Sequence, residues 1–181
     1  MGKLKAALLA RRAAIVDGWF DEALSSYAPE ANLFFKRERN RFANPVGSGL
    51  RSGIEAIFDS LVEEMDPQLI CRHLEEIIKV RAIQDLDPSR AVSFVFGLKQ
   101  VVRQQLKGEL RQADAAAELE GFEARVDQTA LFAFDIYVRC REQFAELRVN
   151  EIKRNVFSVM ERIRRGEVLR PPDGEKEPVA K

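Results

Sequence analysis

FEARVDQTALFAFDIYVRCREQFAELRVNEIKRNVFSVMERIRR, residues 122–165, is the stretch that decides the fold. Its apolar residues recur at the three- and four-residue spacing of a helix. The spacing predicts one continuous helix from about Phe122 to Arg165, and a start as early as Ala115 is also open. Such a helix is far longer than the average of about 11–12 residues. Its apolar pattern changes along its length, so we expect its two halves to have different surroundings.

The first half of this stretch carries two overlapping apolar stripes. One stripe consists of Val126, Ala130, Ala133, Tyr137, Cys140, Phe144 and Leu147, and the other consists of Leu131, Phe134 and Val138. An apolar arc this wide is typical of a helix packed into a core. We therefore expect the core to extend to about Leu147.

The second half carries one narrow apolar seam. Its residues after Ala145 are Val149, Ile152, Val156, Val159 and Ile163. Their spacing of four and three is a heptad repeat, and the rest of this half is charged. A narrow seam suits a contact between two helices, so we expect residues 148–165 to protrude from the globule and to pair with a second copy in a homodimer.

Helix starts before this stretch are marked by prolines. Asn44-Pro45, Asp66-Pro67 and Asp87-Pro88 each place a capping side chain before a proline that tolerates the first helical position. Two further helices are expected over Leu4–Tyr27 and Glu30–Arg41. The helix after Pro88 should bury a stripe of Val92, Val95, Phe96, Leu98, Val102 and Leu106. The prediction is an all-α fold, a bundle of about six helices with a long C-terminal helix.

Length and composition limit the number of domains, the classes of partner and the compartment that we can expect for this chain. The 181 residues suffice for one helical domain over 1–165, and the Pro-, Gly- and charge-rich residues 166–181 are expected to be disordered. Lys+Arg and Asp+Glu number 29 each, which argues against nucleic-acid binding. No run of about 18 uncharged apolar residues exists, so we expect no membrane span. Two distant cysteines, Cys71 and Cys140, suit a reducing cytoplasm.

Catalytic and metal-binding patterns are missing from the sequence. His73 is the only histidine, so a zinc site would lack further ligands, and two readings of it remain open: a haem ligand followed by two long helices, or an ordinary helix residue. Adjacent carboxylates such as Glu75 and Glu76 point in different directions on a helix and form no acid–base pair. We expect no enzyme activity, no metal and no cofactor.

Two polar segments are candidates for contact with a ligand or partner. Arg81, Gln84 and Asp85 precede the helix start at Pro88 and form either a ligand contact or a polar network that fixes the turn. The segment from Phe35 to Phe42 mixes aromatic residues with Arg37, Arg39 and Arg41. It is either a partner or phosphate patch or a solvated face.

Three stretches carry a resemblance to a known family. They are Trp19-Phe20 followed by RFANPVGSGLRSGIEAIFDSL (41–61), RAIQDLDPSRAVSFVFGLK (81–99) and FDIYVRCREQFAELRVNEIKR (134–154). Together they resemble the N-terminal domain family of RsbT co-antagonist proteins of the RsbRD type, over most of residues 10–155. The resemblance implies a globin-like, non-haem, dimeric domain of a bacterial stress-signalling regulator, which senses a signal and passes it to a C-terminal STAS domain.

The chain departs from that arrangement at its C-terminus. It ends at Lys181, soon after the long helix, so we expect no attached output domain and an unidentified protein partner. The leading expectation is a non-enzymatic sensory or regulatory module that acts as a dimer. One alternative is a globin-like protein that binds haem or a small ligand through His73. Another is a helical adaptor that binds a protein through its Phe35–Phe42 face.

Overall fold

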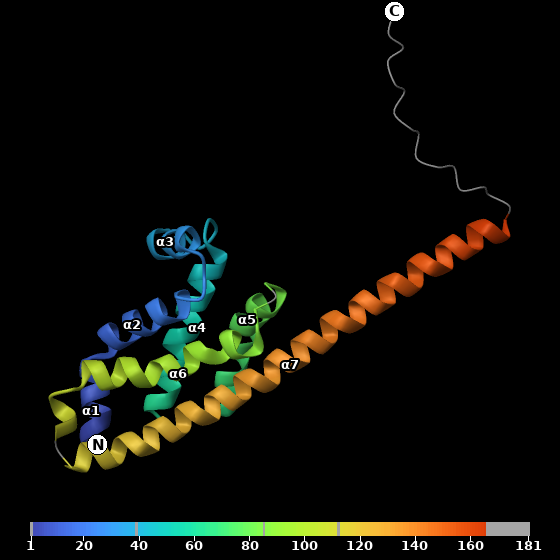
Figure 1. The fold of residues 1–181 in the computed structure, drawn as a ribbon. Helices are drawn as coiled ribbons and strands as arrows, with labels where there is room; N and C mark the ends of the chain where they lie inside the picture. Colours follow the sequence, from blue (N-terminus) through green and yellow to red (C-terminus); the bar gives the residue numbers. More distant parts are fainter. Residues whose placement is uncertain (1, 39, 85, 112, 166–181) are drawn as a thin grey trace, which may run out of the picture. The chain divides into compact units, whose positions relative to one another are not determined.

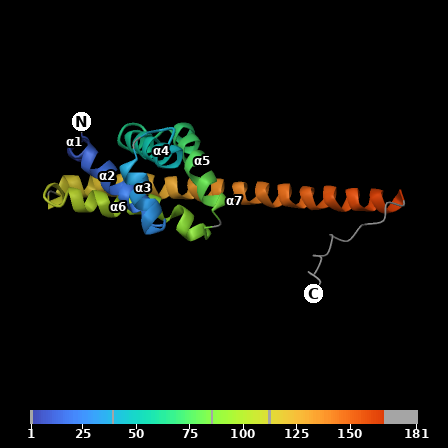
Figure 2. The same ribbon diagram turned by 90° about the horizontal axis from the view of Figure 1, so that it is seen from above.

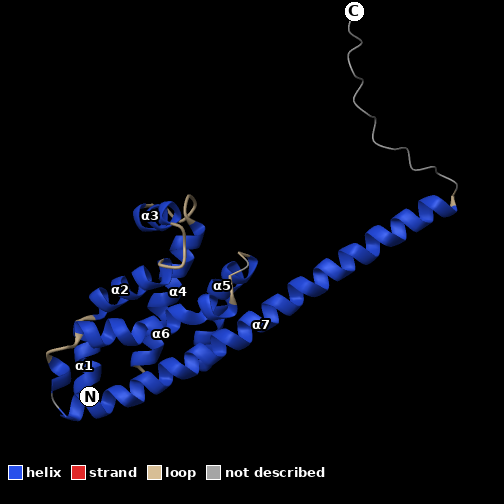
Figure 3. Cartoon of the chain, viewed as in Figure 1, coloured by secondary structure: helices blue, strands red, loops and turns tan. Residues whose placement is uncertain are grey.

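The computed structural model describes residues 2–38, 40–84, 86–111 and 113–165, without the side chains of 111, 113, 114 and 116. Within these ranges every regular element is a helix and there is no strand (Figure 3). The helices are α1 (Lys3–Ala10), α2 (Arg12–Leu24), α3 (Pro29–Arg37), α4 (Pro45–Val62), α5 (Pro67–Ile83), α6 (Pro88–Gln105), a short 3₁₀ helix (Glu109–Arg111) and α7 (Ala113–Arg164). The prediction of an all-α fold with a long C-terminal helix is confirmed.

The first predicted helix is in fact two helices. Arg11 leaves the helical conformation at φ −106° and ψ 12°, which separates α1 from α2 (Figure 1). The N–H groups of Lys3 and Leu4 donate to the carboxylate of Glu118 in α7, at 3.1 and 2.9 Å. This contact satisfies donors at the start of α1 that have no partner within the helix. Tertiary contact therefore holds α1 separately, which the helical spacing alone did not show.

Two of the three predicted caps are present. The Asn44 side chain accepts from the Gly47 N–H, and the Asp66 carboxylate accepts from the N–H groups of Gln68 and Leu69. Asp87 precedes Pro88 as predicted, but its side chain makes no capping hydrogen bond. The proline and cap pairs thus locate the starts of α4 and α5, whereas α6 begins at its proline without a side-chain cap.

The core is built from crossed helix pairs. α4 packs most extensively against α5, and α2 packs against α6 (Figure 2). Trp19 of α2 is fully buried, stacks on Phe94 of α6 with ring centroids 6.3 Å apart, and donates its indole N–H to the Phe94 carbonyl oxygen at 2.7 Å. α7 contributes Phe122, Val126 and other buried residues to the same core.

The chain forms two compact units, Met1–Arg141 and Glu142–Lys181. In the first unit one predicted stripe of α7 is buried from Val126 to Cys140, but Leu131, Phe134 and Val138 are exposed. Phe96, predicted to be buried in α6, is also exposed. In the second unit Leu147 is exposed, so the expectation of a core reaching this residue is wrong. The helical period placed these residues correctly on their faces, but the protein's own core covers only one of those faces.

Candidate functional site

A wholly buried arginine joins three helices of the first unit. Arg81, in the last turn of α5, has no exposed surface. One terminal nitrogen donates to the Ala23 carbonyl oxygen near the end of α2 at 2.6 Å. The other donates to the carbonyl oxygens of Ala91 and Arg90 in α6, at 3.3 and 3.4 Å. The planar guanidinium thereby holds the end of α2 beside the first turn of α6.

The charge of Arg81 is balanced without a carboxylate among the described residues. Its guanidinium carbon lies 4.5 Å from the Phe94 ring centroid and 5.6 Å from that of Tyr27. Aromatic faces and carbonyl oxygens near a helix C-terminus both favour a cation. Burial lowers the pKa of Arg81, and Tyr27 partly opposes this change. Nε of Arg81 is buried and has no hydrogen-bond partner among the described residues.

The predicted network around Arg81 is only partly assembled. Gln84 is exposed, whereas Arg81 points into the core, so the two side chains have separate surroundings. Asp85 lies outside the described residues. The contacts of Arg81 with three carbonyl oxygens support the reading that it fixes the junction between helices.

The backbone of His73 lies at a close contact between two helices. His73 lies on α5, which crosses α4 at Gly53. A Cβ atom at Gly53 would lie 3.0 Å from Cδ1 of Ile77 and 3.7 Å from the His73 carbonyl oxygen. Nδ1 of His73 is buried and, within the part of the chain that the structure describes, has no hydrogen-bond partner. α4 and α5 are therefore in direct contact at the backbone of His73, and the haem reading of its side chain stays a prediction.

Thiol and metal chemistry have little support in the described part of the chain. Cys71 and Cys140 are both free. Burial raises the pKa of each thiol above its usual value, which disfavours the reactive thiolate. Among the described residues, no three His, Cys, Asp or Glu side chains are grouped so as to hold a metal ion. None of the described helices has the length and apolar character needed to cross a membrane.

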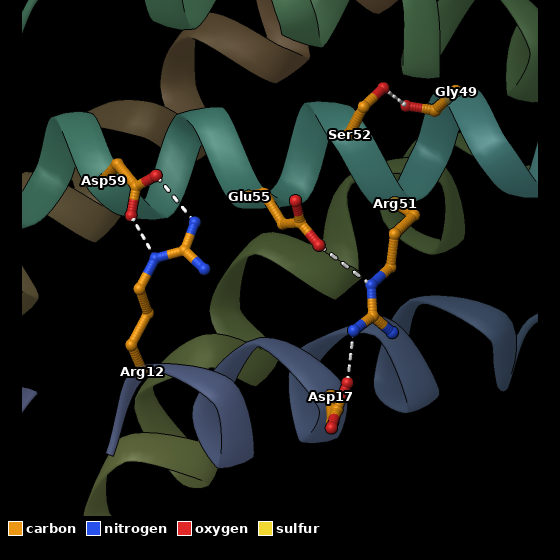
Figure 4. Close-up of polar contacts among 7 residues, drawn as sticks. All are labelled: Arg12, Asp17, Gly49, Arg51, Ser52, Glu55 and Asp59. Atoms are coloured by element: carbon orange, nitrogen blue, oxygen red, sulfur yellow. Dashed lines mark hydrogen bonds and ion pairs between the residues drawn. The ribbon is translucent and has the colours of Figure 1, made fainter. Parts of the chain in front are cut away.

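A ladder of ion pairs joins α2 to α4 along one side of the first unit (Figure 4). The Arg12 guanidinium donates two hydrogen bonds of 2.7 Å to the Asp59 carboxylate, and this contact raises the pKa of Arg12. Elsewhere along the same two helices, Arg51 of α4 donates to Glu55 of α4 at 3.0 Å and to Asp17 of α2. The bidentate pair and the bridging arginine fix the position of α2 along α4.

A groove of about 490 Å³ opens beside this ladder, between α2, α3 and α4. Most of its charged lining residues are in ion pairs: Arg51 binds both Asp17 and Glu55, and Lys36 lies 2.9 Å from Asp21, which is outside the lining. Phe35, one end of the predicted aromatic and basic segment, lines this groove. Arg39 of that segment lies outside the described residues. Because most of its charges are in ion pairs, this groove offers a ligand little electrostatic attraction.

An apolar surface lies where α6 and α7 run side by side in the first unit. Lys99 pairs with Asp127 and Arg103 with Glu123, so the two helices are antiparallel. Phe96, Leu131, Phe134 and Val138 are exposed on this surface, which we call the α6–α7 face. Their exposed neighbours include the uncharged Ser93, Gln100 and Gln128. Charged residues also lie here, because the Lys99–Asp127 pair and the exposed Asp135 are close to the apolar residues in the two helices.

The apolar residues predicted to form the dimer seam lie in the second unit. Val149, Ile152, Val156, Val159 and Ile163 are all exposed, at 41–60%. They lie in one uninterrupted helix at the heptad spacing. Nothing among the described residues covers them. The sequence identified these residues by their period, whereas it gave no sign that the α6–α7 face lies outside the core.

Comparison with known proteins gives one match. The family described as "RsbT co-antagonist protein rsbRD N-terminal domain" matches residues 13–152, well over half of the chain. No curated protein and no solved structure matches the chain. The match begins in α2 and ends in α7, so it takes in the buried arginine, the α6–α7 face and the first residues of the seam.

Proposed function

The chain belongs to the RsbT co-antagonist protein RsbRD N-terminal domain family, and from this premise we propose that it is a non-enzymatic sensory and regulatory module that works as a homodimer. The family consists of regulatory sensory domains rather than enzymes, which supports the regulatory part of the proposal. In line with the family resemblance, we also propose a globin-like arrangement of the helices. Two free cysteines suit a place in the reducing cytoplasm.

The observation that carries the dimer is the exposed seam of the second unit. Fully burying a side chain such as valine or isoleucine stabilises by about 1.5–3 kcal/mol. A second copy of the same helix would cover Val149, Ile152 and Val156 at the spacing that knobs-into-holes packing requires. This gain supports pairing between copies over an isolated helix with its apolar residues in water.

The α6–α7 face gives the dimer a second line of support. Its exposed apolar residues, Phe96, Leu131, Phe134 and Val138, come from two neighbouring helices. A monomer that exposes such a patch risks aggregation, so large apolar patches usually have a partner. In the proposed dimer the same face of a second copy covers it.

Single charges placed on each surface test the dimer. Val156→Glu should raise the dissociation constant at least about tenfold, because a carboxylate would be buried in the seam. Ser158→Glu is the matched control, because it adds the same charge about 200° around the helix from Val156. Light scattering over a dilution series measures both, with circular dichroism to check the fold. Equal dissociation constants for the two variants would contradict the proposal that the seam forms the dimer interface.

Leu131→Glu tests the α6–α7 face in the same way. Its expected effect is a weaker dimer with unchanged helix content, because Leu131 is 59% exposed in the single chain. Gln68→Glu, an exposed change at the start of α5, should leave the dimer intact. If Leu131→Glu dimerises like the wild type, the α6–α7 face is not part of the dimer interface. The role of the seam then depends on the result for Val156→Glu alone.

A further inference from the structure

A hydrogen-bonded loop presents one aromatic side chain to solvent. The buried Asn44 donates from Nδ2 to the carbonyl oxygens of Phe35 and Glu38, at 3.1 and 2.8 Å, and accepts from Gly47. The Phe42 N–H donates to Oδ1 of Asn40 at 2.9 Å. Phe42 is nevertheless 96% exposed. The loop is held by its own bonds, so the exposure of Phe42 does not follow from a lack of local structure.

Phe42 stands at the edge of an apolar groove of about 640 Å³. The groove runs over the first turns of α4, where Val46 and Leu50 line it, and over the later turns of α5 at Val80. Gly49 lies in its wall, and a Cβ atom built there would meet no other atom within 4 Å. The groove therefore has an open position at Gly49 that a side chain could fill without disturbing the fold.

Two charges border this groove without partners in the described part of the chain. Arg41 comes from the loop and Glu76 from α5, and neither side chain has an ion pair or hydrogen bond with a described residue. The other groove differs, because Arg51, Asp17 and Glu55 in its lining are paired with one another. A helix with an acidic residue at one border and a basic residue at the other would complement Arg41 and Glu76.

We propose that this groove binds an amphipathic helix of a partner protein, with apolar side chains against Val46, Leu50 and Val80, an acidic residue near Arg41 and a basic residue near Glu76. Phe42 packs against the apolar face of that helix. The inference rests on the proposed regulatory function, which requires a protein partner, and it assigns that partner a surface separate from the dimer seam.

A helix fits the groove better than a small molecule does. Small ligands are held in sites that bury most of their surface, whereas Phe42 projects outward and needs a larger body to cover it. Residues 46 and 50 of α4 and residues 76 and 80 of α5 are spaced as ridges of two packed helices, and a third helix packs into the valley between such ridges. Amphipathic helices are recognised in grooves of this kind.

The test uses a displayed library of amphipathic peptides of about 14 residues, or roughly four helical turns. Each peptide has a fixed apolar stripe and variable charges at its borders. Selected peptides are titrated into the isotopically labelled full chain and followed by NMR. We expect shifts at the amides of Val46, Gly49 and Val80. Selected sequences should be enriched in an acid and a base on opposite sides of the stripe.

Two variants and a control decide the outcome. Gly49→Leu fills the groove and Phe42→Ser removes the anchor, and each should weaken binding at least about tenfold. Gly121→Leu, at a position in α7 with equally open surroundings, should bind like the wild type. If no peptide binds, or if binding is equal in all three variants, the proposal is wrong. It is also wrong if the fatty acid dodecanoate binds in the groove without any peptide, because the site would then hold a small apolar ligand. Chemical shifts of the groove amides that change with protein concentration alone would mean that a second copy of the chain occupies the groove, which would also contradict the proposal.

The same samples separate this inference from the dimer. Light scattering on Gly49→Leu should give the wild-type dissociation constant of the dimer, and Val156→Glu should bind peptide like the wild type. A monomeric wild type that still binds peptide would overturn the dimer alone. A dimer that binds no peptide would overturn the groove alone.

Discussion

Arg81 shows how a single residue can organise several helices at a cost in solvation. A buried cation is unfavourable unless its hydrogen bonds and charge are compensated. Here the compensation comes from the carbonyl oxygens of Ala23 and Ala91 and from the rings of Phe94 and Tyr27. The flat, forked guanidinium reaches α2 and α6 at once, which a single ammonium group could not do.

Arg81→Lys, which keeps the charge, should therefore lower the free energy of unfolding more than Arg81→Met, which removes it. We expect it to lower the free energy of unfolding by about 3 kcal/mol, because a buried ammonium keeps the solvation cost and loses part of the hydrogen bonding. Arg81→Met should cost less, about 1–2 kcal/mol, since it removes the buried charge and keeps most of the volume. Urea unfolding followed by the fluorescence of Trp19, the only tryptophan, measures both.

Arg72→Lys is the control for this comparison, because Arg72 is exposed on the same helix. It should change the free energy of unfolding by less than about 0.5 kcal/mol. An Arg81→Lys protein as stable as this control would show that the charge, rather than the fork, is what the junction needs.

Asn44 is the second residue with an effect beyond its own position. Asn44→Ala removes two donors to the loop and the cap of α4, and should lower the free energy of unfolding by about 2–3 kcal/mol. Asn40→Ala, an exposed change in the same loop, should cost less than about 1 kcal/mol. Chemical unfolding compares them. Similar losses in the two variants would contradict the role given to the buried amide.

At the scale of elements, the sequence predicted helices better than it predicted their surroundings. The starts of α4 and α5 followed from a proline and a capping side chain, which are local features. The break at Arg11 did not follow from a local signal, and neither did the contact of Glu118, far away in the sequence, with the start of α1. Spacing shows which residues share a face, but it cannot show what covers that face.

The functional surfaces illustrate the same limit. Leu131 and Phe134 have the same residue types as a core stripe, and only the structure shows that they are exposed. Arg81 was noticed for its polarity, yet arginine is almost never fully buried, so its burial could not be expected. The heptad seam was found from its period because a long helix keeps its faces aligned.

The ion-pair ladder between α2 and α4 should contribute alignment more than stability. Arg12 and Asp59 are each more than a third exposed, so water screens their attraction. A double-mutant cycle with Arg12→Met and Asp59→Asn should give a coupling of about 0.5–1 kcal/mol in low salt, falling in 1 M NaCl. A coupling that stays the same in high salt would mean that the pair is shielded from solvent.

At the scale of the whole molecule, the apolar surfaces remain outside the core of a single chain. The seam of the second unit and the α6–α7 face of the first unit are separately exposed. The chain belongs to the RsbRD N-terminal domain family, and in the proposed homodimer a second copy would cover both surfaces. The homodimer is therefore the central claim about how this protein works.

Sedimentation equilibrium of the unmodified chain, from about 1 to 50 µM, tests that claim most directly. The chain has a mass of 20.6 kDa, and the account predicts a species of twice that mass that dissociates only towards the lowest concentrations. A mass of 20.6 kDa across the whole range would contradict it.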